Sequence, residues 1–256
     1  MKRALILLFA LLSLTWGEGR AETGWRTDLL NAYLEDNMPV WKAYIDSCHS
    51  SADAEQSLPY EYGYCAALME ENKTAAKPYV LRFKQNVEAA KDRLPAGHYE
   101  MYKSAVYVYE LRLHESFHPV RSLDLARKAV KIAPDDPLTL TYCGMALFYA
   151  PKPFGNKKEA LNLFLRAYEL FAGPQWHNCW WKAAAVMYIA QCYQKQGDLQ
   201  RAQEYAEKAL AEYPNFRFIP SLFSYLLNTL FEGVPVSEGT VFHFDTVVTD
   251  GVRAVA

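Results

Sequence analysis

The clearest pattern in the chain is a helical one, and it lies between residues 183 and 214. Apolar side chains recur there at intervals of three and four residues, first over 183–193 and again over 199–210. Gly197-Asp198, a typical tight-turn pair, separates the two stretches, and the second ends at Pro214, which stops a helix. The pattern therefore predicts two antiparallel helices joined by a short turn.

Short side chains recur at fixed places in this hairpin. Ala190 lies on the first helix, and Ala202 and Ala209 lie on the second. Two antiparallel helices joined by a tight turn approach closely only where their facing side chains are short. We therefore expect these alanines at the contact between the helices.

The same hairpin pattern occurs in the two segments before this one. Residues 137–171 contain it with a longer turn, the sequence PKPFG at 151–155, whose two prolines and glycine predict a protruding loop. Residues 98–114 and 122–136 form the other hairpin, and Asp136 is predicted to cap the helix that follows. The short residues in the two hairpins are Ala126, Ala129, Gly144, Ala160 and Ala167.

These landmarks give the chain its resemblance to a known family. A small residue, an aromatic residue, a glycine turn, two alanines and a proline follow one another as in the 34-residue tetratricopeptide repeat. Residues 98–216 resemble the tetratricopeptide repeat (TPR) superfamily, and the long turn is similar to that of exported bacterial members, including helper proteins of solute transporters. The resemblance implies an all-α fold, a right-handed superhelix (solenoid) of TPR-like hairpins.

The segments that flank the repeats follow the pattern less closely. Residues 22–97 are expected to form degenerate N-terminal helices, capping helices first and then a degraded fourth pair. Residues 217–232 read as an apolar C-terminal capping helix, which a stack of repeats needs at its open end. Residues 233–256 alternate β-branched residues with glycines, which predicts an extended or disordered tail.

The first residues have the features of a secretory leader. A basic start is followed by the apolar run Ala4 to Leu14 and by small residues that end at Ala21. At about 1.5 Å per residue this run is too short to cross a bilayer core of about 30 Å. We expect residues 1–21 to be a signal peptide, and the alternative is an N-terminal helix that stays on the fold.

Charge and cysteine content limit the function further. The formal net charge of −2 gives no basic surface for nucleic acid. No later stretch is long and apolar enough for an integral membrane span, and no cysteine near the cut would carry a lipid anchor. We therefore expect an exported protein, in the bacterial periplasm or secreted, without a lipid anchor. If that compartment is oxidising, Cys48 and Cys65 are candidates for a disulfide, and the alternative is buried free thiols.

One string has the spacing of a zinc site. His114-Glu115-Ser116-Phe117-His118 matches H-E-x-x-H, in which two histidines one helical turn apart bind zinc. Pro119 follows directly and disfavours helical geometry at His118, so we expect the string to lie at a helix end instead. No other catalytic or nucleotide-binding motif is present, and we predict no catalytic residue, metal or cofactor.

The resemblance also implies a binding groove. In the TPR superfamily the first helix of each pair lines a concave face, and counting from the small residue of each repeat places a set of aromatic and polar residues there. These groove positions are Tyr99, Tyr102, Tyr109, Thr141, Met145, Phe148, Tyr149, Met187, Gln191, Gln194 and Lys195. Tyrosines combine contact area with a hydroxyl, which suits a peptide. The alternative is that other segments fill the groove and these rings are core.

The function expected from these observations is binding rather than catalysis. We predict a non-catalytic exported module that holds a protein or peptide partner in the groove, with a scaffold or accessory role in the cell envelope. A small-molecule-binding helper of a solute transporter is the second reading. A zinc metalloprotease acting through His114 to His118 is the third.

The leader predicts how the protein is processed. The exported form is expected to begin at Glu22 and to carry no acyl chain. Intact mass spectrometry of the protein recovered from the producing cells measures both features. A species that retains residues 1–21, or one with the added mass of a lipid, would contradict the assignment.

Overall fold

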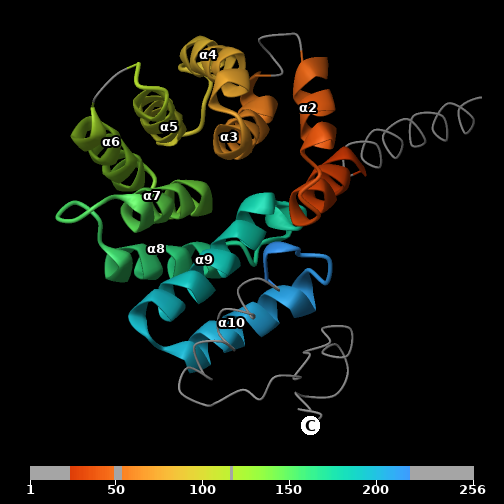
Figure 1. Ribbon diagram of the computed structural model, residues 1–256, viewed down its shortest axis with the longest axis vertical. Helices are drawn as coiled ribbons and strands as arrows, with labels where there is room; N and C mark the ends of the chain where they lie inside the picture. Colours follow the sequence, from red (N-terminus) through yellow and green to blue (C-terminus); the bar gives the residue numbers. More distant parts are fainter. Residues whose placement is uncertain (1–23, 49–53, 116–117, 220–256) are drawn as a thin grey trace, which may run out of the picture.

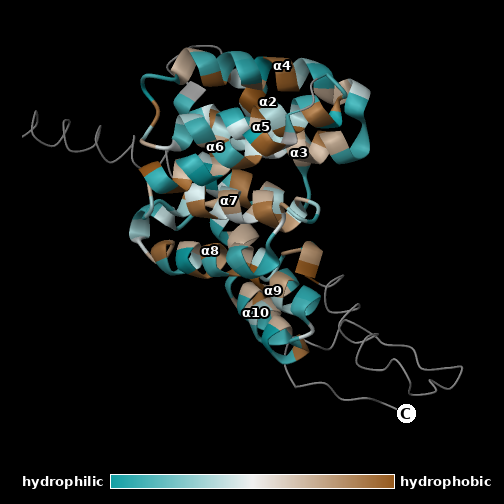
Figure 2. Ribbon diagram, turned by 90° about the vertical axis from the view of Figure 1, so that its left-hand side faces the viewer, coloured by the Kyte–Doolittle hydropathy of each residue, from teal (hydrophilic) through white to brown (hydrophobic). Residues whose placement is uncertain are grey.

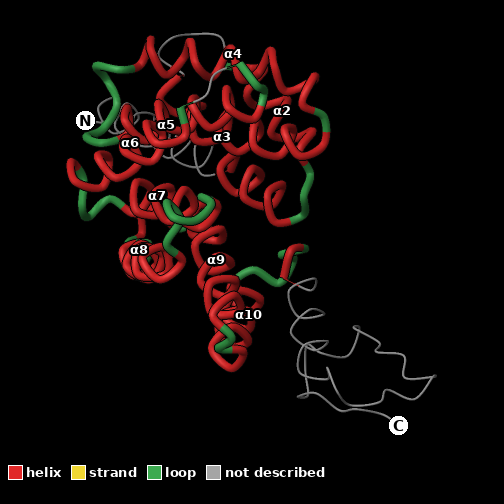
Figure 3. Tube along the Cα trace, turned by 60° about the vertical axis from the view of Figure 1, so that its left-hand side comes forward, coloured by secondary structure: helices red, strands yellow, loops and turns green. Residues whose placement is uncertain are grey.

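Helices make up all of the regular structure that the computed structural model describes, which covers residues 24–48, 54–115 and 118–219 (Figures 1 and 3). A helix at 24–34 comes first. It is followed by α2 (Met38–Ser47), α3 (Ala54–Glu71), α4 (Lys73–Ala90), α5 (His98–Arg112), α6 (Pro119–Ile132), α7 (Pro137–Tyr149), α8 (Lys157–Leu170), a 3-10 turn (Pro174–Trp176), α9 (Trp180–Gln196) and α10 (Leu199–Glu212). The prediction of an all-α fold is confirmed. The predicted leader, most of the capping helix and the tail lie outside the described residues.

Successive helices pack as hairpins. The pairs α3 with α4, α5 with α6, α7 with α8 and α9 with α10 make the most extensive helix contacts, and each pair also packs on the next. Figure 2 shows α4 at the top, α3, α5 and α6 below it, and then α7, α8, α9 and α10 toward the bottom. The prediction of TPR-like helical hairpins is confirmed, whereas the handedness of the superhelix stays a prediction.

Short side chains lie at the contacts between helices, as the spacing predicted. The alanines at these positions are fully buried, namely Ala126, Ala129, Ala160, Ala167, Ala190, Ala202 and Ala209. A Cβ added to Gly144 would lie 2.7 Å from the Phe164 ring, so α7 can approach α8 this closely only with glycine there.

Side-chain caps fix the starts of four helices. Asp136 accepts a hydrogen bond from the Thr139 N–H at 2.8 Å, which confirms its predicted role at the start of α7. Asn72, Asn156 and Asp198 cap α4, α8 and α10 in the same way. Each cap satisfies an otherwise unpaired N–H in the first turn of its helix, which is worth about 1 kcal/mol.

The N-terminal helices pack against both the first and the last hairpin. The Trp41 ring from α2 lies over Gly63 of α3, where an added Cβ would be 2.2 Å from the ring. The same ring contacts Trp180 at the start of α9, with 5.3 Å between the ring centroids. The Trp41 indole N–H donates to the carbonyl of Leu29 at 2.7 Å, which holds the helix at 24–34 against α2. The first and last parts of the described chain therefore meet.

Two hydrogen bonds join the N-terminal helix at 24–34 to the C-terminal part of the described chain. Asn178 donates to the Thr27 hydroxyl at 2.9 Å, and the Arg217 N–H donates to the carbonyl of Leu34 at 2.9 Å. Residues on the N-terminal helix are thus hydrogen-bonded to residues that are far away in the sequence.

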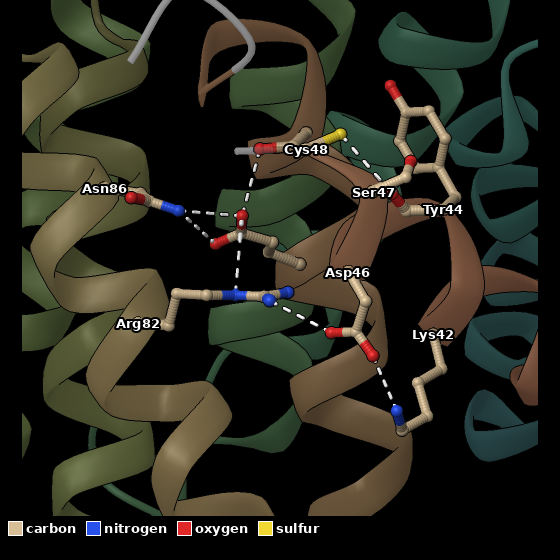
Figure 4. A network of polar contacts seen from close by, with 9 residues as sticks. Lys42, Tyr44, Asp46, Ser47, Cys48, Arg82 and Asn86 are labelled. Atoms are coloured by element: carbon tan, nitrogen blue, oxygen red, sulfur yellow. Dashed lines mark hydrogen bonds and ion pairs between the residues drawn. The ribbon is translucent and has the colours of Figure 1, made fainter. Parts of the chain in front are cut away.

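A buried carboxylate connects α3 to its neighbours (Figure 4). Glu61 accepts hydrogen bonds from Ser57 at 3.0 Å and from Asn86 of α4 at 2.8 Å. The Arg82 guanidinium lies 4.0 Å from Glu61 and donates to Asp46 of α2 at 3.1 Å. Burial raises the pKa of Glu61, and the nearby Arg82 opposes that rise only in part. The network ties α2, α3 and α4 together.

The raised pKa of Glu61 predicts how stability depends on pH. The folded protein holds the Glu61 proton more tightly than the unfolded chain, so the stabilising contribution is present below the ordinary carboxyl pKa of about 4.3 and is lost as pH rises through the folded value. Glu61→Gln keeps the side-chain shape without the ionisation. We expect the free energy of unfolding of the wild type, minus that of the variant, to fall as pH rises from about 4 to about 7.

Urea denaturation at several pH values measures this difference, since ionisations common to both proteins cancel. A difference that grows with pH would show that Arg82 and Asn86 lower the pKa of Glu61 instead.

Candidate functional site

Tyr62 of α3 brings the first helices of all four hairpins together. Its ring stacks on Trp181 of α9 with 5.1 Å between centroids and contacts Tyr142 of α7 at 5.7 Å. It also lies 6.0 Å from Tyr109 of α5, whose hydroxyl donates to the Tyr62 carbonyl at 2.7 Å. Aromatic side chains therefore link the faces that these helices turn toward one another.

Burial of four predicted groove residues corrects part of the groove prediction. Tyr102, Tyr109, Thr141 and Met145 are buried, so they do not line an open surface. Tyr102 and Tyr109 both pack against Phe83 of α4. The count along each helix assumed that the first helices expose this face, whereas here Tyr102 and Tyr109 pack against α4 and the Tyr62 ring contacts α7 and α9.

The remaining groove positions fall into two places. Tyr99 lies against α4, where its hydroxyl donates to Glu88 at 3.1 Å. Phe148 and Tyr149 end α7, and beside them α9 carries Met187, Gln191, Gln194 and Lys195, all at least partly exposed. The structure thus brings the C-terminal halves of α7 and α9 together and leaves Tyr99 apart.

An exposed aromatic group is the main feature of this region. Tyr149 is 68% exposed, the largest value among the large hydrophobic side chains of the described chain. Its hydroxyl lies 3.0 Å from that of Tyr188 on α9, and Tyr188 stacks on Phe164 of α8 at 5.2 Å. Phe148 contacts both tyrosine rings. We call Phe148, Tyr149, Met187, Tyr188, Gln191 and Lys195 the Tyr149 surface.

Sequence reasoning missed two members of this neighbourhood. Tyr188 directly follows Met187, which was among the predicted groove positions. It lies four residues after Ala184 and three before Gln191, so the three residues share one face of α9. This helical spacing could have identified Tyr188 from the sequence. Lys157, the first residue of α8, places its ammonium 6.0 Å from the centre of the Phe148 ring, within range of a cation–π interaction.

The tyrosines around this surface are held as neutral phenols. Burial raises the pKa of Tyr188 well above its ordinary value, and the Tyr149 hydroxyl raises it further. Burial likewise raises the pKa of Tyr33 and Tyr62, and Tyr149 adds to both shifts, so these hydroxyls face a common region. Neutral phenols both donate and accept hydrogen bonds, which suits recognition of backbone amides.

Comparison with known families supports the repeat assignment. Residues 183–216, which form α9, α10 and the turn after them, match the tetratricopeptide repeat family model. The protein is TPR-like. No curated protein matches the chain. A TPR indicates a role in protein–protein interaction.

The H-E-x-x-H string of this TPR-like protein does not lie on one helix. α5 ends at Arg112, His114 has a left-handed backbone with φ +60°, and His118 precedes the first residue of α6. Zinc binding by this motif needs both histidines on one helical face. Glu115 lies 3.7 Å from Lys77. Within the described ranges, no three His, Cys, Asp or Glu residues gather in a way that would hold a metal ion.

The candidate disulfide between Cys48 and Cys65 is not formed in the structure. Cys65 is buried, whereas the Cys48 thiol donates to the Tyr44 carbonyl at 3.4 Å (Figure 4). Burial raises the pKa of Cys143, Cys179 and Cys192 to about 12. These thiols are therefore protonated at neutral pH and are poor nucleophiles.

The described helices include none with the length and hydropathy required to cross a bilayer.

The contrast between Tyr109 and Tyr149 gives a stability prediction. Tyr109→Ser removes a buried ring and leaves its hydrogen bond to Tyr62 unmade, so we expect it to destabilise the fold by about 3 to 5 kcal/mol. Tyr149→Ser removes an exposed ring and is expected to change stability by about 0.5 kcal/mol or less. Chemical denaturation measures both. Equal losses would contradict the placement of the two tyrosines.

Proposed function

We propose that the protein is a non-catalytic binding module that holds a protein partner on the Tyr149 surface. The observation that carries this proposal is the exposure of Tyr149, whose ring is held by Phe148 and Tyr188 yet remains 68% accessible. Exposed tyrosines held in place by neighbouring rings lose little side-chain entropy on binding and act as interface anchors. The TPR over α9 and α10 supports a protein as the partner.

Proposed binding is confined to one end of the hairpins. Tyr102, Tyr109, Thr141 and Met145 are buried, so the proposal places the partner at the C-terminal ends of α7 and α9 and on the loop between α7 and α8. That loop carries Phe154, a second exposed ring. The polar side chains Gln191 and Gln194 continue the surface along α9 and offer amide groups to a peptide backbone.

The cellular location of this function stays a prediction from the sequence. The features of residues 1–21 support export, and we propose an accessory or scaffold role in the cell envelope. Those residues lie outside the described part of the chain. The zinc hydrolase interpretation loses its support, because His114 and His118 lie between α5 and α6 and not on one helix.

Substitution of Tyr149 tests the proposed binding. Affinity purification of the tagged full chain from the native envelope fraction, followed by binding measurements with the purified partner, is expected to show loss of at least about tenfold in affinity for Tyr149→Ser, the loss typical of an anchor residue. Tyr107→Ser is the matched control, since Tyr107 lies on α5 next to His118 and Arg121. Equal binding by both variants and the wild type would overturn the proposal.

A further inference from the structure

Lysines without a carboxylate partner gather around the Tyr149 surface. Lys152, Lys157, Lys158 and Lys195 form no ion pair in the described part of the chain, whereas lysines on the remaining helices mostly do. The others without a carboxylate partner are Lys73, Lys91 and Lys131, on or beside α4 and on α6. This end of the molecule therefore presents positive charge beside exposed rings.

The elements that carry the surface contain no acidic residue. Neither α7 nor α9 has an aspartate or glutamate, and neither does the loop at 150–156. The nearest acids are engaged elsewhere, since Glu159 pairs with Arg127 at 3.2 Å and Asp198 pairs with Arg201 at 3.5 Å. The positive charge of these lysines is thus left for an occupant of opposite sign.

Two of these lysines lie at a helix N-terminus, where acidic residues are preferred. Lys157 and Lys158 open α8, where the helix dipole favours acidic side chains over cations. Glu159 lies in the same turn but pairs with Arg127 at 3.2 Å. A further carboxylate docked beside the two lysines would be favoured by the same dipole.

The chain itself contains a segment of the complementary kind. Residues 238–250, EGTVFHFDTVVTD, carry three carboxylates, at Glu238, Asp245 and Asp250, and no lysine or arginine. Phe242 and Phe244 lie between these acids and are spaced two residues apart, so an extended strand would present both on one side. The segment combines aromatic anchors with negative charge, as the surface requires.

The described chain also ends within reach of the surface. Its last residues include Phe218, whose ring lies 6.3 Å from that of Tyr33, and the Tyr33 ring lies 5.1 Å from that of Trp180, the first residue of α9. The residues between Ile219 and Glu238 supply about 1.5 Å each if helical and about 3.3 Å each if extended. The extended reach exceeds the length of α9, which is about 26 Å for its 17 residues, so it can bring residues 238–250 to the C-terminal end of that helix.

We propose that residues 238–250 dock within the same chain on the Tyr149 surface, with their carboxylates beside Lys157, Lys158 and Lys195. The inference rests on the proposed function, because the segment then occupies the face that binds the partner. A tethered segment competes at an effective concentration of about millimolar, so a partner with similar chemistry must displace it. The docked tail thereby raises the partner concentration that is needed for binding.

Zero-length cross-linking of the full chain tests this docking. A carbodiimide joins a lysine amine to a carboxylate only where the two are in contact. We expect peptide mapping of the monomer to show bonds from Lys157, Lys158 or Lys195 to Glu238, Asp245 or Asp250. Lys73 and Lys131 are the matched controls, because they also lack a carboxylate partner and lie on other helices. The yield within one chain is expected to stay constant on dilution.

Aromatic anchoring is tested by two variants of the full chain. Tyr149→Ser and Phe244→Ser are each expected to lower the cross-link yield by about tenfold, as loss of an anchor does. Absence of the cross-links, equal cross-linking of Lys73 and Lys131, or a yield that rises with protein concentration would each overturn the inference. If Tyr149→Ser abolishes partner capture but no tail cross-link forms, the proposed function stands and only the docking of the tail fails.

Discussion

The contact between Tyr62 and Trp181 decides what kind of repeat protein this is. It joins α3 of the first hairpin to α9 of the last, with the two rings nearly parallel at 11°. Offset aromatic pairs of this kind are worth about 0.5 to 1.5 kcal/mol beyond the area that they bury. Because Tyr62 also contacts Tyr109 and Tyr142, the first helices of the other two hairpins are held at the same point. An open stack of repeats is thereby drawn closed.

The packing of these rings also determines which tyrosines are exposed. The N-terminal helices add Trp41 between Gly63 and Trp180, which joins the first hairpin to the last. Tyr149, the last residue of α7, is exposed outside this contact. Tyr109 is buried, which is why stability is expected to respond to a change at Tyr109 and not at Tyr149.

The helices were predictable from sequence because local rules determine them. Ala202 and Ala209 mark a helix contact, and Asp136 marks a helix start, whatever the remainder of the chain does. The exposure of the groove positions was not predictable in the same way. Whether Tyr102 faces solvent depends on its contact with Phe83 of α4, 19 positions earlier in the sequence, and on how the helices pack together. Tyr149 is exposed because it is the last residue of α7.

A double-mutant cycle on Tyr62 and Trp181 tests the closed arrangement most directly. Each residue is changed to leucine, singly and together, and the free energy of unfolding of the four proteins is measured by urea denaturation. The account predicts a coupling energy of about 0.5 to 1.5 kcal/mol, since the two rings stack in the folded state. Additivity within about 0.3 kcal/mol would place the rings apart and contradict the closure of the repeats around Tyr62.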